Sequence, residues 1–207
     1  MTKNVGVRNV FIIFKRLKKM KKIIKIVYLY ILRILKGGKN AFGYKKFGVG
    51  SVICHPMRIM GKKNISIGKR CYILNGLRME AVSCWGKDNY NPSISLADDV
   101  MIQQDCHITC ANKISIGKGT SILPNVLITD ITHVKEVGKS LDQTGLSIGS
   151  IHIGENCIIG MGARIMANGK DLFIGNDVVI GANAVVTKNI EDATIAVGIP
   201  AQMIKKI

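Results

Sequence analysis

The sequence predicts an all-β fold in which short parallel strands stack as the coils of a triangular prism. Three observations predict it: apolar residues recur every six positions, glycine often follows the apolar residue, and a small or β-branched residue stands four positions after it. A period of six suits neither an amphipathic helix nor a simple strand alternation. Each unit is therefore expected to form a short strand and a turn, with three units in each coil.

The repeat is clearest from residue 94 onwards, and a fragment of it appears earlier in "ISIGKRCYI", from Ile65 to Ile73. We expect the aliphatic residues to fill the prism, the smaller residues to pack at its corners, and Gly or Asn to relieve the turns. The aliphatic residues are Leu96, Ile102, Ile108, Ile116, Ile122, Ile128, Ile153, Ile159, Ile165, Ile174, Ile180 and Val186. The smaller residues are Thr120, Val126, Ala163, Val178 and Ala184.

The composition agrees with a core of small side chains. The chain has 207 residues, of which 47% are hydrophobic but only 5% aromatic. The six cysteines contain no CxxC pair and fit no zinc framework, so no metal site is predicted. Cys71, Cys106 and Cys157 each follow an Ile by four positions, which predicts buried thiols in a reducing compartment.

Two parts of different charge are expected, a basic arm at 1–46 and a prism domain at 47–207. The arm has fourteen Lys or Arg and no acidic residue, whereas the rest of the chain has 16 basic and 13 acidic residues. The net charge of +17 therefore does not indicate nucleic acid binding by the body. An apolar stripe predicts an amphipathic helix over 9–36 that ends before Gly37 and Gly38. The stripe consists of Ile13, Leu17, Met20, Ile24, Val27, Ile31 and Ile34.

Three arrangements of the helix at 9–36 remain open. It packs on the body of its own chain, lies on an anionic membrane surface, or pairs as a coiled coil, which the repulsion of basic helices disfavours. Its uncharged runs are too short to span a membrane, and it shows no signal-peptide cleavage site. We expect a cytoplasmic protein with peripheral contact at the inner face of the plasma membrane.

The repeat stops within 130–150 and resumes at "IHIGENCIIG". A smooth prism has few concavities, so a loop that leaves it is expected to create a cleft. His133 lies in "TDITH", where this loop opens. An imidazole is suited to take a proton from a hydroxyl group near neutral pH, and a nearby carboxylate can orient it. His133 is therefore the candidate base and Asp130 the candidate orienting group, with capping of the turn as the alternative for Asp130.

Two further polar residues near the break are candidates for binding an acceptor. Asn125 lies in "PNVLITD", where its alternative role is that of a corner residue, and His107 lies in the regular unit "QDCHIT". The other histidines are weaker candidates. His152 directly precedes the resumed repeat and is expected to be structural, and His55 belongs to no motif.

The many repeat units, the Asp and His at the break, "DQTGL", and the closing "VTK" and "VGIPAQMIKK" resemble the hexapeptide-repeat acyltransferases. The resemblance is to the O-acetyltransferases of sugars and bacterial surface polysaccharides, and it covers roughly residues 47–207. It implies a left-handed parallel β-helix, a homotrimer, acetyl-CoA as the donor, and a short C-terminal cap at 197–207. One departure is Ile158, which stands where many relatives have a Trp.

The same resemblance implies a donor site against the C-terminal coils, in the groove between neighbouring prisms. Small residues would let the pantetheine arm approach the backbone, a bend at "VGIPA" would lie beside the adenine, and lysines would hold the phosphates. The residues in these positions are Gly160, Ala163, Gly181, Ala182, Pro200, Lys188, Lys205 and Lys206.

The sequence therefore predicts transfer of an acetyl group from acetyl-CoA to a sugar hydroxyl, with His133 as general base. Direct transfer is favoured over an acyl-enzyme because no Cys or Ser nucleophile motif accompanies His133. N-acylation of a nucleotide-linked amino sugar and a non-catalytic assembly module remain alternatives. A carbonic anhydrase-like metal enzyme would need three closely spaced histidines, which the four in this chain do not supply. Nucleic acid is not expected as a partner, because the arm has no known reading motif.

Overall fold

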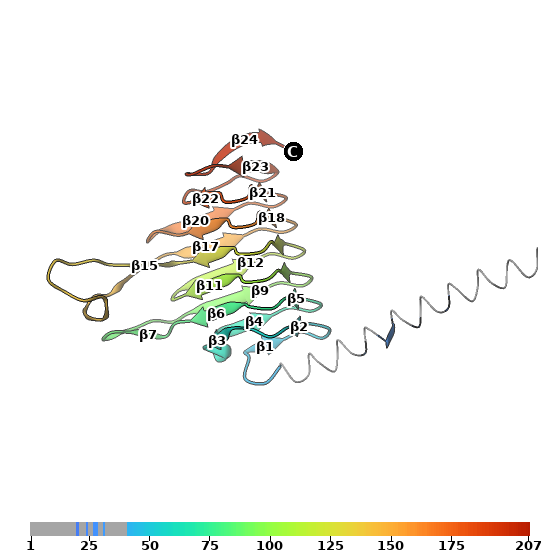
Figure 1. Cartoon of the computed structure of the whole chain (residues 1–207), viewed down its shortest axis with the longest axis horizontal. Helices are drawn as coiled ribbons and strands as arrows, with labels where there is room; N and C mark the ends of the chain where they lie inside the picture. The colour runs from blue at the N-terminus through green and yellow to red at the C-terminus, as the bar shows by residue number, and fades with distance from the viewer. Residues whose placement is uncertain (1–19, 21–23, 25–26, 29–30, 32–40) are drawn as a thin grey trace, which may run out of the picture.

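The protein is a parallel β-helix whose coils stack along one axis (Figure 1). The computed structural model describes residues 20, 24, 27, 28, 31 and 41–207. Three parallel sheets form the sides of the prism, here named sheets A, B and C, and each full coil adds one strand to each sheet. The predicted all-β fold with three strands to a coil is confirmed.

The strands are short, and their bounds are as follows. Sheet A holds β1 (Lys46–Phe47), β4 (Ile65–Ile67), β9 (Ser93–Leu96), β12 (Lys113–Ile116), β17 (Ser150–Ile153) and β20 (Asp171–Ile174). Sheet B holds β2 (Val52–Ile53), β5 (Tyr72–Ile73), β10 (Met101–Ile102), β13 (Ser121–Ile122), β18 (Ile158–Ile159), β21 (Val179–Ile180), β23 (Thr194–Val197) and β24 (Gln202–Lys206). Sheet C holds β3 (Arg58–Met60), β6 (Arg78–Ala81), β11 (His107–Cys110), β14 (Leu127–Thr129), β19 (Arg164–Met166) and β22 (Val185–Val186).

Stacked aliphatic side chains fill the prism, as the six-residue period predicts. In sheet A, for example, Leu96, Ile116, Ile153 and Ile174 lie in register on successive coils, and all four are buried. The predicted corner residues Thr120, Val126, Ala163, Val178 and Ala184 are also buried. Cys71, Cys106 and Cys157 are buried thiols outside any disulfide, as predicted. Burial raises the pKa of the Cys106 thiol to about 11, so this thiol stays protonated at neutral pH.

Hydroxyl groups join the turns of neighbouring coils. The Ser51 hydroxyl donates to the Gly68 carbonyl over 2.6 Å and accepts from the Cys71 backbone N–H over 2.9 Å. Thr120 repeats this pattern three coils later with Gly154 and Cys157. These bonds satisfy polar backbone groups that lie between coils, where water has little access.

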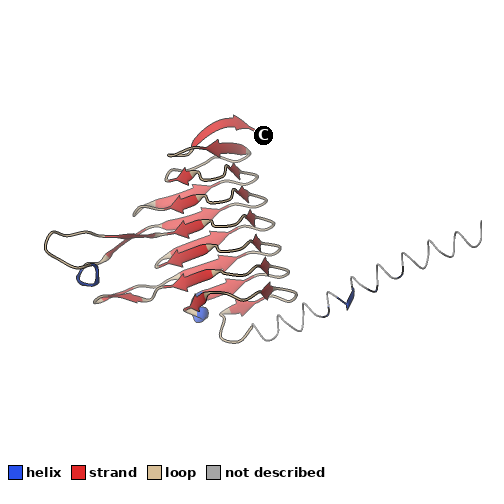
Figure 2. Cartoon of the chain, viewed as in Figure 1, coloured by secondary structure: helices blue, strands red, loops and turns tan. Residues whose placement is uncertain are grey.

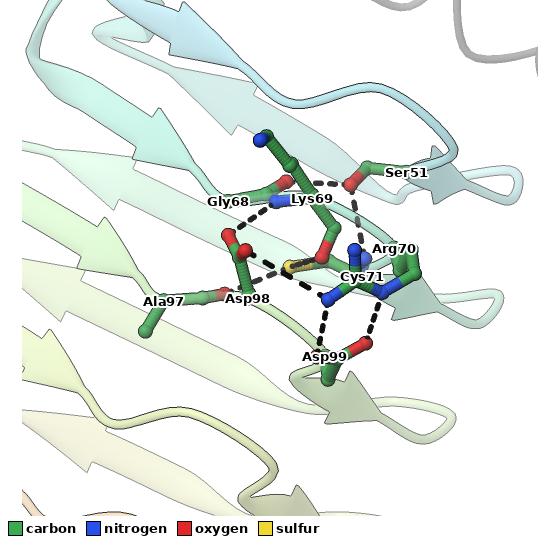
Figure 3. A network of polar contacts seen from close by, with 8 residues as sticks. All are labelled: Ser51, Gly68, Lys69, Arg70, Cys71, Ala97, Asp98 and Asp99. Carbon is green, nitrogen blue, oxygen red and sulfur yellow. Dashed lines mark hydrogen bonds and ion pairs between the residues drawn. The ribbon is translucent and has the colours of Figure 1, made fainter.

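Acidic side chains reinforce the same corner of the prism (Figure 3). The Lys69 backbone N–H donates to the Asp98 carboxylate over 2.8 Å, and the Arg70 guanidinium binds Asp99 through two hydrogen bonds of 2.6 Å. Each carboxylate reaches across to the preceding coil. The turns are thereby held in register as well as the strands.

Two excursions leave the prism, and both leave at the corner between sheets C and A. The first follows β6 and forms the hairpin of β7 (Cys84–Trp85) and β8 (Asp88–Asn89). The second follows β14 and begins and ends as an antiparallel ribbon of β15 (Ile131–His133) and β16 (Leu146–Ile148). Figure 1 shows β7 and β15 on the same side of the prism, and Figure 2 shows the loop beyond the second ribbon.

Short 3₁₀ helices complete the described chain. They are η1 (Lys62–Asn64), beside β3, and η2 (Leu141–Gln143), in the second excursion. At the other end of the prism β24 pairs antiparallel with β23, within the segment predicted as a cap. Most of the predicted helix at 9–36 lies outside the described residues. Of its apolar stripe, Met20, Ile24, Val27 and Ile31 are described as helical and are at least 50% exposed.

Candidate active site

A cleft of about 670 Å³ lies where the two excursions meet the outer face of sheet C. Its floor comes from β3, β6, β11 and β14, and its walls come from the hairpin and the ribbon. The prediction that the interrupted repeat creates a cleft therefore agrees with the structure. The lining residues are Arg58, Met60, Arg78, Glu80, Val82, Cys84, Trp85, His107, Thr109, Leu127, Thr129, Ile131, His133 and Leu146.

The two excursions support each other. The Trp85 indole N–H of the hairpin donates to the Leu141 carbonyl of the long loop over 3.1 Å. The Tyr90 hydroxyl accepts from the Leu146 backbone N–H over 3.0 Å. Gly86 lies so close to the loop that a Cβ there would stand 2.7 Å from the Asp142 carbonyl oxygen. The cleft walls are thus one connected unit.

His133 is the last residue of β15 and its side chain is exposed at the cleft. Its ring packs against the Trp85 ring, with 4.7 Å between ring centroids and an interplanar angle of 58°. Since a tilted aromatic contact leaves the edge of the imidazole accessible, this contact orients the ring without consuming its nitrogens. His133 therefore lines the cleft, and its role as the base stays a prediction.

His107 lies on the cleft floor in β11. Its Nε2 is 2.6 Å from the Thr109 hydroxyl, two residues along the same strand. Burial and the positive charge of Arg78 lower the pKa of His107, while Glu80 opposes this effect. A neutral imidazole at neutral pH suits a residue that hydrogen-bonds a sugar hydroxyl. The structure thus brings His107 and His133 into one cleft.

Asp130 has a different environment from the one predicted for an orienting group. It is fully buried, and its carboxylate accepts from the Ala111 N–H over 2.8 Å, from the Asn112 N–H over 2.9 Å and from the Cys110 thiol over 3.2 Å. None of its described hydrogen bonds reaches His133. Burial raises the pKa of Asp130, and the two backbone N–H groups oppose this rise.

The contacts of Asp130 fix the base of the second excursion. Its carboxylate caps the turn of the coil beneath, while its own carbonyl accepts from the Gly149 N–H over 3.0 Å. Gly149 is where the loop returns, and its carbonyl accepts from the Asn112 side chain over 2.9 Å. Asp130 therefore acts as the anchor of the loop, which is the capping alternative for this residue.

Asn125 is likewise a corner residue in the structure. It has a left-handed backbone, with φ of 60°, a conformation that Asn tolerates in turns. Its carbonyl accepts from the Arg164 guanidinium over 2.6 Å, and its side chain does not line the cleft. The structure gives no support to an acceptor-binding role within one chain.

The residues predicted for the donor site lie away from the cleft, in the C-terminal coils. Gly160 and Gly181 stack so closely that a Cβ on Gly160 would stand 2.6 Å from a Gly181 backbone atom, and Ala182 is exposed beside them. Ala163 is fully buried at the prism corner, as expected for the fourth position after the aliphatic residue, and its role at the donor site stays a prediction.

The predicted phosphate-binding lysines are all exposed. Lys188 and Lys205 have exposed side chains, whereas Lys206 pairs with Glu191 over 2.9 Å and also donates to the Asp192 carbonyl. Pro200 lies in the exposed turn before β24. Among the residues that the structure describes, no group of three His, Cys, Asp or Glu side chains is placed to hold a metal ion.

Sequence reasoning missed the hairpin at β7 and β8 and the charged residues beneath it. The signal was present, because the early repeat fragment ends at Ile73 and the repeat resumes only near Ile94. The interval contains Trp85, the single Trp of the chain. It also missed Arg58, Arg78 and Glu80, which the strand register of sheet C brings together.

Comparison with known proteins gives consistent results. The chain is 29% identical over 163 residues to a putative lipopolysaccharide biosynthesis O-acetyl transferase, WbbJ, of Escherichia coli, covering 75% of this chain and 78% of that protein. It is 28% identical over 153 residues to a galactoside O-acetyltransferase of Lactococcus lactis, covering 73% of this chain and 67% of that protein. No protein-family model matches the chain.

Among solved structures, the fold is similar to AntD, an N-acyltransferase of Bacillus cereus in complex with dTDP and 3-hydroxybutyryl-CoA. The TM-score is 0.63 at 16% identity, over 82% of this chain and 86% of that chain. This likeness concerns the fold alone, and it confirms the predicted left-handed parallel β-helix. Together with the sequence relatives, it confirms the expected resemblance of this chain to the hexapeptide-repeat acyltransferases, enzymes that use CoA-linked donors.

Proposed function

We propose that this protein transfers an acetyl group from acetyl-CoA to a sugar hydroxyl in the synthesis of a bacterial surface polysaccharide or related glycan. The observation that carries the proposal is the cleft that holds His133 and His107 on the outer face of the prism. The named relatives support the acceptor class, since one is a lipopolysaccharide biosynthesis enzyme by name and the other a galactoside O-acetyltransferase.

In the proposed reaction, His133 accepts the proton of the sugar hydroxyl while the oxygen forms a bond to the thioester carbonyl carbon. The carbon–sulfur bond then breaks, and the CoA thiolate takes the proton from the imidazolium. The products are a sugar acetyl ester and free CoA. Direct transfer is favoured because Cys84, a thiol in the cleft lining, has no described hydrogen bond to either histidine.

The donor site is proposed at the C-terminal coils, along the backbone at Gly160, Ala163, Gly181 and Ala182. Pro200 lies in the adjoining turn, and Lys188, Lys205 and Lys206 are proposed to lie near the phosphates. None of these residues lines the cleft of its own chain. We therefore propose a homotrimer in which the cleft of one chain faces the C-terminal coils of the next. Sheet B offers outward apolar side chains for such contacts, with Tyr72, Met101 and Ile158 each about two-fifths exposed and Ser121 between the last two.

The first test is calorimetric binding of acetyl-CoA, followed by turnover of the wild type and of His133→Ala. Loss of the base should lower turnover by at least about 10²-fold with the melting temperature unchanged. His55→Asn is the matched control, because His55 is exposed and lies outside the cleft lining. Near-normal turnover of His133→Ala would remove His133 from the mechanism.

Mixed oligomers test the shared site. Ala182→Trp should block the donor groove without disturbing the core, because Ala182 is exposed. When this variant is coexpressed with His133→Ala, chains with an intact cleft should meet chains with an intact donor groove, and part of the activity should return. No recovery, or a monomer by sedimentation, would contradict the trimeric site.

N-acylation of a nucleotide-linked amino sugar remains the second candidate, because the structural neighbour AntD is an N-acyltransferase. The same assay separates the two activities when hydroxyl and amino acceptors are supplied in parallel. Hydroxylamine removes an acetyl ester but leaves an acetamide intact. A product that resists hydroxylamine would therefore favour the second candidate.

We also propose that the protein is cytoplasmic and that the arm at 9–36 contacts an anionic membrane surface. In the described chain, no helix is long and apolar enough to cross a bilayer. Exposure of Met20, Ile24, Val27 and Ile31 supports surface contact. Anionic vesicles should retain the full chain at low salt, and Ile24→Asp with Ile31→Asp should abolish retention. Equal behaviour on neutral vesicles would contradict the proposal.

A further inference from the structure

Two arginines lie side by side on the floor of the cleft. Arg58 of β3 and Arg78 of β6 are directly opposite each other in the parallel register, and His107 of β11 is next in the same row. All three point to the outer face of sheet C and line the cleft. The row therefore begins with two fixed positive charges and continues to a histidine that stays neutral near pH 7.

One carboxylate compensates both arginines. Glu80 is 5% exposed and lies 2.8 Å from an Nη of Arg78 and 3.2 Å from Nε of Arg58. The arginine side chains are themselves 42% and 59% exposed. Apart from the two histidines, the charged groups of the lining are Arg58, Arg78 and Glu80, which leave a net charge of about +1. One guanidinium is enough to neutralise the charge of the Glu80 carboxylate. The positive charge of the second guanidinium is therefore not compensated.

Several N–H groups of these two side chains have no acceptor in the described chain. A guanidinium has five donors. Arg78 directs an Nη to Glu80, and its buried Nε has no hydrogen-bond partner. Arg58 has its ion pair with Glu80 and a 3.7 Å contact from Nη2 to the Met60 sulfur. Two forked donors facing one cleft match the oxygens of a carboxylate or a phosphate.

We propose that the acceptor carries an anionic group, and that Arg58 and Arg78 bind it while the hydroxyl to be acetylated faces His133. The shared chemistry is a negatively charged oxygen group, either the carboxylate of an acidic sugar or the phosphate of a sugar phosphate. This inference rests on the proposed function, because it assigns the acceptor class of the same cleft. Trp85, on the cleft wall, supplies an aromatic surface beside the sugar position.

A phosphate of acetyl-CoA is an alternative ligand for the two arginines. The position of Arg58 and Arg78 along the prism argues against it. Arg58 and Arg78 lie on the first and second strands of sheet C from the N-terminal edge, β3 and β6. The residues proposed for the donor begin at Gly160, three coils beyond β6. Binding of acetyl-CoA should therefore not depend on Arg58.

The experiment compares methyl β-glucuronide, glucose 6-phosphate and methyl β-glucoside, first as ligands of the full chain by calorimetry and then as acetyl acceptors. The wild type should bind at least one anionic sugar at least about tenfold more tightly than the neutral one, because charge-assisted hydrogen bonds are strong. Comparison of methyl β-glucuronide with glucose 6-phosphate shows whether the site prefers a carboxylate or a phosphate. The preference should weaken at high salt.

Arg58→Gln is the main variant, because Glu80 keeps its ion pair with the closer Arg78. The melting temperature of the variant shows whether it is folded. The preference for the anionic sugar should fall by about tenfold or more, while the affinity for acetyl-CoA changes less than about twofold. Lys63→Gln is the matched control, because it removes one nearby exposed charge that does not line the cleft.

The outcomes separate the two proposals. Equal binding of all three sugars by the wild type, or an anion preference that survives Arg58→Gln, would overturn the anionic acceptor. A parallel loss of acetyl-CoA affinity would reassign Arg58 to the donor. Tight binding of an anionic sugar without acetyl transfer to any acceptor would leave the binding inference standing and refute the proposed function.

Discussion

Replacement of Asp130 tests whether this residue anchors the loop or orients His133. Asp130→Ala removes the acceptor of two backbone N–H groups, one of them on the fully buried Ala111. An unsatisfied buried donor costs about 1–3 kcal/mol, and the more accessible Asn112 N–H costs less. The sum is roughly 3 kcal/mol of unfolding free energy. For a chain of this size, that lowers the melting temperature by about 6–12 °C.

Asp130→Asn refines the test, because the amide keeps one acceptor oxygen and should cost about half as much. Burial raises the pKa of Asp130 above its unfolded value. The stability that this group contributes is therefore fully present below the unfolded pKa, and it decreases as the pH rises through the folded pKa. Asp130→Asn should remove that dependence above about pH 4.

The assay combines calorimetric melting with turnover at a temperature where every variant is folded. Glu155→Ala is the control, because it removes an exposed carboxylate that has no described hydrogen bond. A melting temperature within about 2 °C of wild type for Asp130→Ala would refute the anchoring argument. A large loss of turnover in Asp130→Asn with unchanged melting would instead support an orienting role for Asp130.

Further predictions concern the coil stacking, the cleft wall and the thiols. Gly154→Ala should cost at least about 2 kcal/mol by calorimetric melting, because the Cβ would stand 2.5 Å from the Gly175 carbonyl oxygen. Gly138→Ala, with no neighbour within 4 Å, should cost only about 1 kcal/mol for its left-handed backbone. Trp85→Ala should speed tryptic cleavage after Lys135 and Lys139 in the loop, whereas Phe173→Ala, an exposed aromatic of sheet A, should not. Iodoacetamide at neutral pH should label the exposed Cys84 fastest and leave Cys106 unmodified until unfolding, and early labelling of Cys106 would contradict its burial.

The fold was predictable because the prism repeats one local rule. Every coil places an aliphatic residue inside, such as Ile116 or Ile153, and a small residue at the corner, such as Thr120. Because the period is six, the pattern fixes both the strand and the turn. Ala163 shows the limit of this reasoning. The repeat predicts its burial at the corner, whereas its donor role comes only from the resemblance and stays a prediction.

The site was less predictable, because it depends on contacts between distant segments. His133 and Asp130 are close in sequence, but the chain leaves the prism between them. Asp130 still belongs to the corner and points inward, whereas His133 belongs to the ribbon and faces the cleft. Likewise, the Arg58, Arg78 and Glu80 cluster appears only when β3 and β6 are paired in register.

The positions of the two excursions explain why a prism with flat sides contains a cleft. They leave from β6 and β14, which are the two neighbours of β11 in sheet C. β11 continues directly to sheet A without an excursion, so its outward residues His107 and Thr109 stay uncovered between the two walls. Asp130 ties the second excursion to the turn after β11, and Trp85 ties the first excursion to the second. The cleft therefore depends on one excursion leaving the prism one coil before β11 and the other leaving one coil after it. If the second excursion left from a strand one coil further along, His133 would be separated from His107.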